Sequence, residues 1–267
     1  MSESDATGGR ARGQSFTVRL IQDDAGVSQG EEWCEVEYEG RVRRIRFHDY
    51  AEIFSIPGLY ERLFYDVLEC ASPRTVGALV AEDLERLGYD AGKLRVLDVG
   101  AGNGMVAEEF ARLGASEIVG IDILPEARLA AMRDRPDVYD DYLVADLTDM
   151  PHPVRETLRA RRFNCLTVVA ALGFGDIPPL AFVEAYNLVE PQGWVAFTIK
   201  EEFLGGHDDT GFARLIRQML DSGVLRLHSQ RRYRHRLLVT GEPLYYVAMV
   251  GSRREPVPAS WAEAGGS

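Results

Sequence analysis

A buried-strand pattern that runs directly into closely spaced glycines constrains the fold of this chain more than any other feature. Residues 96–104 read VLDVGAGNG, and the sequence that follows has the apolar spacing of an amphipathic helix. Glycine tolerates positive φ angles and lets a ligand approach the main chain without a Cβ in the way. The segment therefore predicts a nucleotide-binding turn between a strand and a helix of an α/β protein.

The spacing of the glycines distinguishes two kinds of nucleotide site. A dinucleotide fingerprint, G-x-G-x-x-G, needs its third glycine at the position that Met105 occupies. The pattern that begins at Asp98 and continues through Gly100, Gly102 and Gly104 is D-x-G-x-G-x-G. This pattern resembles motif I of the class I methyltransferases that use S-adenosylmethionine (SAM).

The resemblance extends from about residue 72 to residue 252 and implies the α/β fold of that family. This fold is a doubly wound, seven-stranded, mostly parallel sheet with an antiparallel last strand. Strand and helix patterns alternate across residues 72–252, which agrees with such a SAM-binding domain. Residues 14–71 predict a β-hairpin followed by an aromatic helical cap. Polar, small-residue composition predicts disorder in residues 1–13 and 253–267.

The glycine turn is the first part of the implied cofactor site. By resemblance, the backbone amides of Gly100, Ala101, Gly102 and Gly104 are expected to meet the carboxylate of SAM. The resemblance also implies that Asp98 holds the SAM ammonium group directly or through water. In a doubly wound sheet the ligand lies at the carboxyl ends of the strands, so the residues after the other strands are candidates as well.

Two further aspartates stand at predicted strand ends. Asp122 and Ile123 follow the second strand, where a carboxylate can accept hydrogen bonds from both ribose hydroxyls. Asp146 and Leu147 follow the third, where the carboxylate suits the adenine amino group and the leucine suits the ring. Ala170, after the fourth strand, is expected beneath the methionine arm. Each aspartate has an alternative role as the cap of the following helix, and that alternative stays open.

Aromatic residues are concentrated in the predicted cap, which this family often folds over the cofactor and the acceptor. Tyr60 and Tyr65 are the cap residues that we expect at the methionine end of SAM. Ordinary packing against the edge of the sheet is the alternative for each tyrosine.

The catalytic residues are less constrained than the cofactor contacts. Methyl transfer from a sulfonium depends on the orientation of the acceptor and needs no protein nucleophile. A general base helps when the acceptor is a hydroxyl. His207, in a loop after the fifth strand, is the first candidate base, and His48, at the start of the cap, is the second. We expect no metal, because the consecutive residues 207–209 are poorly arranged to converge on one ion.

Bulk composition limits the partners. The net charge of −12 disfavours a broad nucleic-acid-binding surface. The basic run RRYRHR, residues 231–236, suits a solvated strand face or a contact between the subunits of a homodimer. Three scattered cysteines, the lack of a long apolar stretch and the lack of a signal-peptide pattern predict a cytoplasmic protein without a membrane span.

These features together predict a SAM-dependent methyltransferase that acts on a small molecule, such as an oxygen acceptor in secondary metabolism. The N/D-P-P-Y/F motif of amino-group nucleic-acid methyltransferases is absent after the fourth strand, where residues 173–179 read GFGDIPP. Nitrogen acceptors in bases are therefore disfavoured. A protein or RNA methyltransferase and a non-catalytic SAM-fold binding protein are the alternative interpretations.

Overall fold

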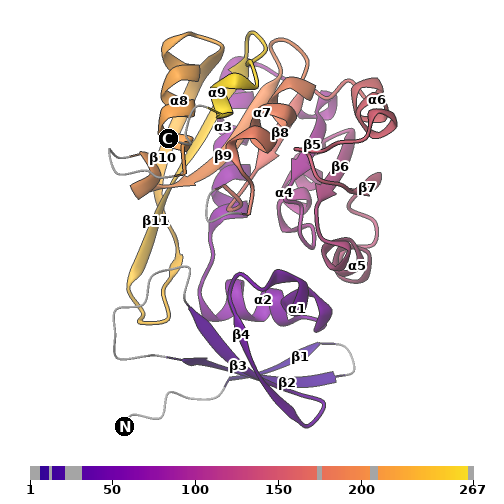
Figure 1. Cartoon of the computed structure of the whole chain (residues 1–267), viewed down its shortest axis with the longest axis vertical. Helices are drawn as coiled ribbons and strands as arrows, with labels where there is room; N and C mark the ends of the chain where they lie inside the picture. The colour runs from indigo at the N-terminus through magenta and orange to yellow at the C-terminus, as the bar shows by residue number, and fades with distance from the viewer. Residues whose placement is uncertain (1–6, 12–13, 22–31, 173–175, 205–209, 264–267) are drawn as a thin grey trace.

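A seven-stranded sheet forms the body of the computed structural model, which describes residues 7–11, 14–21, 32–172, 176–204 and 210–263 (Figure 1). The strand order is β10-β11-β9-β8-β5-β6-β7. The parallel strands are β5 (Arg95–Val99), β6 (Glu117–Asp122), β7 (Asp141–Val144), β8 (Cys165–Val168) and β9 (Trp194–Lys200). β11 (Pro243–Arg253) pairs antiparallel with both β9 and β10 (Leu225–Leu237). The predicted fold class is confirmed.

Helices cover both faces of this sheet. On one face, α3 (Ser72–Leu87) and α4 (Met105–Leu113) contribute Val76 and Phe110 to a buried cluster. On the other, α6 (His152–Ala160), α7 (Pro179–Leu188) and α8 (Phe212–Asp221) contribute residues such as Phe182 and Phe212. All four residues of β8 are buried, as expected for a parallel strand covered on both sides. Among the described helices, none combines the length and the apolarity that a bilayer crossing requires.

The ends of α3 follow from its sequence. Pro73 lies in the first turn, where its missing N–H breaks no helical hydrogen bond. Gly88 ends the helix in the left-handed conformation, with φ of 65°. The chain then passes through the short 3₁₀ helix η3 (Ala91–Lys93) into β5, so the glycine turn lies at the carboxyl end of β5, a strand inside the sheet between β8 and β6.

A smaller antiparallel sheet and a helical cap precede this body (Figure 1). The strands of the small sheet are β1 (Thr7–Ala11), β2 (Gln14–Ile21), β3 (Trp33–Tyr38) and β4 (Arg41–Arg46). The cap contains α1 (Tyr50–Ser55), α2 (Leu59–Glu61) and the π-helix η2 (Arg62–Val67). Phe54 of α1 packs against Ala127 and Ala130 of α5 (Pro125–Asp134), which holds the cap against the body.

Residues 7–11 differ from the expected disorder of residues 1–13. They form β1, which pairs antiparallel with β2 from Thr7 opposite Val18 to Ala11 opposite Gln14. Composition did not predict this strand, because an edge strand is held by backbone hydrogen bonds that glycine can also make.

The segment from residue 253 also differs from the expected disorder of residues 253–267. Arg253 still belongs to β11, and α9 (Ser260–Glu263) follows. Asn187 of α7 holds the intervening chain, since its Oδ1 accepts from the Val257 backbone amide at 2.9 Å and its Nδ2 donates to the Val257 carbonyl at 2.8 Å. The side chain of Val257 is buried in the core, so this stretch belongs to the domain.

Candidate functional site

A cavity of about 480 Å³ lies along the carboxyl ends of β5, β6, β7 and β8. This volume is within the range of about 300–1,000 Å³ typical of small-molecule sites. The predicted cofactor contacts in its wall are Gly100, Gly102, Asp122, Ile123, Asp146, Leu147 and Ala170. His48, Tyr50, Phe54 and Tyr60 of the cap close the other side. The structure therefore brings together residues from four strand ends and from the cap.

The turn after β5 requires glycine at position 100. Gly100 has φ of 67°, and a Cβ there would lie 2.9 Å from the Cβ of Ala171. A larger residue would therefore meet both backbone strain and a clash with the loop that follows β8. Gly104, with φ of 91°, precedes α4 and does not line the cavity of about 480 Å³. Its predicted contact with the cofactor stays a prediction.

Asp98 is buried next to the glycine turn, and its predicted contact with the SAM ammonium group stays a prediction. Its side chain is buried, Thr167 Oγ1 donates to Oδ1 at 2.6 Å, and the Tyr139 hydroxyl donates to Oδ2 at 2.8 Å. Asp98 does not line the cavity of about 480 Å³. Burial raises the pKa of this carboxyl to about 7. We interpret Asp98 as a residue that holds the glycine turn in place, because Thr167 of β8 and Tyr139 each donate a hydrogen bond to one of its oxygens.

Asp122 joins the end of β6 to the glycine turn. Its Oδ2 accepts from the Gly102 amide and its Oδ1 from the Leu124 amide, both at 3.0 Å. Burial raises the pKa of this carboxyl, against the backbone hydrogen bonds that lower it. A carboxylate has about four acceptor positions, so capping leaves room for ligand hydroxyls. The capping role and the predicted place in the cavity wall therefore coexist.

Asp146 is exposed at the rim of the same cavity. Its Oδ1 accepts from both the amide and the hydroxyl of Thr148, each at 2.7 Å. These hydrogen bonds lower the pKa of Asp146, so its carboxylate is held ionised and oriented. Leu147 beside it is buried and lines the cavity.

Ala170 holds a strained conformation in the cavity wall. Its φ is 55°, a left-handed value that is uncommon for a residue with a side chain. Its amide donates to Thr198 Oγ1 at 2.7 Å, which fixes the loop after β8 to β9. Strain of this kind persists where surrounding contacts hold it and is concentrated at functional sites.

A second, smaller cavity of about 60 Å³ adjoins the first between the turn and the cap. Ala101, Tyr60 and Tyr65 line it, and Tyr60 lines both cavities. Burial raises the pKa of both tyrosines, so their hydroxyls stay protonated. The rings of Tyr60 and Phe54 have centroids 4.8 Å apart, so Tyr60 packs within the cap while it faces the site.

His48 lines both cavities and lies beside a carboxylate. Its Nδ1 is 3.3 Å from Oδ2 of Asp176, which follows β8, and the His48 side chain is 17% exposed. This pair links the cap to the loop after the fourth parallel strand. His207, the first candidate base, lies outside the described residues. Within the described ranges, no group of three His, Cys, Asp or Glu side chains is arranged as metal ligands.

Two tyrosines that the sequence analysis did not single out form hydrogen bonds with the glycine turn and with Asp98. The Tyr139 hydroxyl bonds Asp98 and also lies 3.2 Å from the Ala101 carbonyl, and the Tyr142 hydroxyl donates to the Gly102 carbonyl at 2.9 Å. Their rings meet edge to face at a centroid distance of 5.1 Å. The sequence indicated only that Tyr142 is the first residue of a predicted strand, and it did not indicate that either tyrosine contacts the turn.

A family model described as "Methyltransferase domain" matches residues 74–241. Ubiquinone biosynthesis O-methyltransferase from Alkalilimnicola ehrlichii is 37% identical over 109 residues, which cover 39% of this chain and 40% of that protein. Ribosomal protein L11 methyltransferase from Citrifermentans bemidjiense is 51% identical over 57 residues, which cover 20% of this chain and 19% of that protein. The chain therefore spans about two fifths, or less, of the length of these curated relatives.

A solved structure agrees with this fold. N-methyltransferase NodS from Bradyrhizobium japonicum, in complex with S-adenosyl-L-homocysteine (SAH), superposes with a TM-score of 0.53 at 12% identity. The superposition covers 78% of this chain and 98% of that one. At this identity the likeness concerns the fold alone.

Proposed function

Because the chain belongs to the family of SAM-dependent methyltransferases with the class I fold, we propose that it transfers the methyl group of SAM to a small molecule with a hydroxyl acceptor. The observation that carries this proposal is the pairing of His48 with Asp176 where the two cavities adjoin.

The cavity walls fit the cofactor. Asp122 and Asp146 present carboxylates at neighbouring strand ends, where ribose hydroxyls and an adenine amino group would find acceptors. Ile123 and Leu147 beside them offer apolar surface to the purine ring. When bound, SAM supplies an activated methyl group, so the protein needs no nucleophile of its own.

The proposed base is His48. Its Nδ1 lies beside Asp176, so an imidazole that donates its Nδ1 proton to this carboxylate has a basic Nε2. The proton of the acceptor hydroxyl passes to Nε2 as the oxygen attacks, and Asp176 stabilises the resulting imidazolium. A base of this kind contributes roughly 100-fold to 10,000-fold in rate.

The cap and the surface charges support a small acceptor over a macromolecule. Tyr50, Phe54 and Tyr60 form a row of aromatic rings in the cavity wall, which suits a flat, hydroxylated aromatic compound. Four arginines of the basic run are each paired with a carboxylate, which disfavours binding of a phosphate backbone: Arg231 with Glu82, Arg232 with Glu201, Arg234 with Glu69 and Arg236 with Glu32. The relative named for O-methylation in ubiquinone biosynthesis also favours an oxygen acceptor.

We extend this proposal to a cytoplasmic reaction of secondary metabolism. The cysteines Cys34, Cys70 and Cys165 are free thiols, which suit a reducing compartment.

The test is transfer of a labelled methyl group from SAM to a panel of phenols and catechols. His48→Ala is expected to lower kcat about 100-fold or more. His152→Ala, at an exposed histidine of α6, is the matched control and should keep wild-type turnover. Full turnover by His48→Ala would rule out this base, and transfer to RNA or protein but not to the panel would rule out the acceptor class.

A further inference from the structure

Asn103 is a polar side chain of the glycine turn that the proposed chemistry leaves unexplained. It is 1% exposed and lines the smaller cavity beside the turn. Its Nδ2 donates to Glu61 Oε1 at 2.9 Å and to Asp134 Oδ2 at 3.2 Å. The side chain is therefore held between the cap and the end of α5.

These two carboxylates determine which way the amide points. Both protons of Nδ2 are used, and the reversed amide would bring Oδ1 against the oxygens of Glu61 and Asp134. Oδ1 is the remaining acceptor, and it is buried without a hydrogen-bond partner in the part of the chain that the structure describes. A buried acceptor without a donor is unfavourable, so this atom is a candidate for contact with a ligand.

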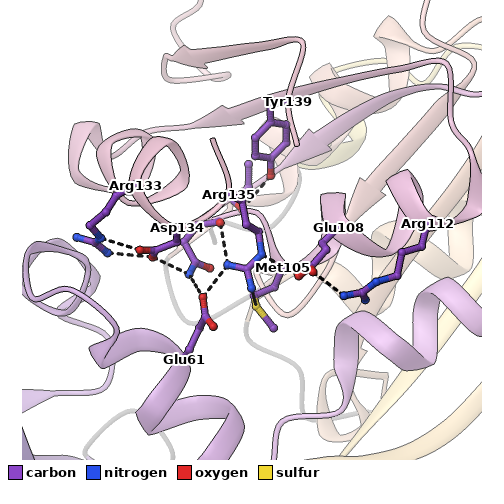
Figure 2. Close-up of polar contacts among 10 residues, drawn as sticks. Glu61, Met105, Glu108, Arg112, Arg133, Asp134, Arg135 and Tyr139 are labelled. Atoms are coloured by element: carbon purple, nitrogen blue, oxygen red, sulfur yellow. Dashed lines mark hydrogen bonds and ion pairs between the residues drawn. The ribbon is translucent and has the colours of Figure 1, made fainter. Parts of the chain in front are cut away.

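The carboxylates are themselves held in place, as Figure 2 shows. Arg135 donates to Glu61 at 2.6 Å and to Glu108 of α4 at 2.9 Å, and Arg133 forms an ion pair with Asp134 at 2.7 Å. The orientation of Asn103 is thus imposed from α2, α4 and α5 together.

We propose that Asn103 Oδ1 accepts a hydrogen bond from the α-ammonium group of the cofactor, an inference that rests on the proposed use of SAM. An N–H donor is what Oδ1 lacks, and an ammonium group is a stronger donor than a neutral N–H because its hydrogen bonds are charge-assisted. Asp98, the residue that the sequence suggested for this contact, has both oxygens engaged and lies outside the cavity walls.

The test compares two ligands by titration calorimetry with the full chain: SAH, and 5′-methylthioadenosine, which lacks the amino-acid part. Asn103→Ala should weaken SAH binding roughly 10- to 100-fold and change binding of 5′-methylthioadenosine by less than about twofold. Equal weakening of both ligands, or of neither, would overturn the assignment. If the wild-type chain binds neither ligand, the use of SAM itself is refuted, which is a distinct result.

A second pair of variants tests the same contact without altering the turn. Glu61 is 38% exposed on the cap, so it can be replaced with little effect on the core. Glu61→Leu removes an acceptor that orients Asn103 and should weaken SAH binding about fivefold while sparing 5′-methylthioadenosine. Glu61→Gln keeps an Oε1 acceptor and should bind SAH within about twofold of wild type. Equal losses in both variants would show that the charge of Glu61, and not the orientation of Asn103, matters.

Discussion

Replacing Asp98 with asparagine removes a buried ionisable group from beneath the glycine turn. Asp98 is 1% exposed and is held by the hydroxyls of Thr167 and Tyr139. Asparagine has the same shape, and the Tyr139 hydroxyl can turn toward the Ala101 carbonyl at 3.2 Å to accommodate the new amide. The variant should therefore fold, while the titration of this site is lost.

The size of the effect follows from the raised pKa. Burial moves the pKa of Asp98 from 3.8 to about 7 in the folded protein. An acid whose pKa is higher in the folded than in the unfolded protein contributes to stability at pH values below its unfolded pKa. This contribution is lost as the pH rises through the folded pKa of about 7. At 1.36 kcal/mol per unit the full effect is ~4 kcal/mol, of which ~2.5 kcal/mol falls between pH 5 and pH 8.

Urea unfolding at pH 5, 6, 7 and 8 measures this difference directly. The free energy of unfolding of Asp98→Asn relative to wild type should rise by ~2.5 kcal/mol from pH 5 to pH 8. Asp149→Asn, at an exposed position, controls for the loss of one acidic side chain. A difference between Asp98→Asn and wild type that stays constant over this range would refute the argument that burial raises the pKa of Asp98.

Three further substitutions test other parts of the account. Asp122→Ala should weaken SAH binding at least about tenfold in calorimetry, because it removes a carboxylate from the cavity wall, and unchanged affinity would remove that assignment. Gly100→Ala should lower the free energy of unfolding by about 2 kcal/mol or more, through positive φ and a 2.9 Å approach to Ala171, and wild-type stability would contradict the packing. Glu32→Ala should lower it by about 3–5 kcal/mol in urea unfolding, since it leaves Arg236 buried without its partner, and a loss under about 1 kcal/mol would contradict this.

Local spacing was enough to predict the strand-end carboxylates. Asp122 and Asp146 lie in the cavity wall because parallel strands bring their carboxyl ends to one edge of the sheet, whatever the intervening helices contain. The two interpretations that spacing left open, capping and ligand contact, are compatible. Asp122 bonds the Leu124 amide and still faces the cavity.

Asp98 shows where local spacing stops being informative. Its partners Tyr139 and Thr167 are 41 and 69 residues away, so their contacts depend on tertiary packing. The same holds for Asn103, whose orientation depends on Glu61 and Asp134, at separations of 42 and 31 residues. Patterns with a period of two or 3.6 residues carry no information on such pairs.

The binding of SAH to the full chain tests the central claim most directly. The account predicts saturable, one-to-one binding in titration calorimetry, with SAM competing for the same site. Absence of saturable binding up to about 1 mM SAH, where even weak specific sites of roughly −4 kcal/mol are half filled, would contradict it.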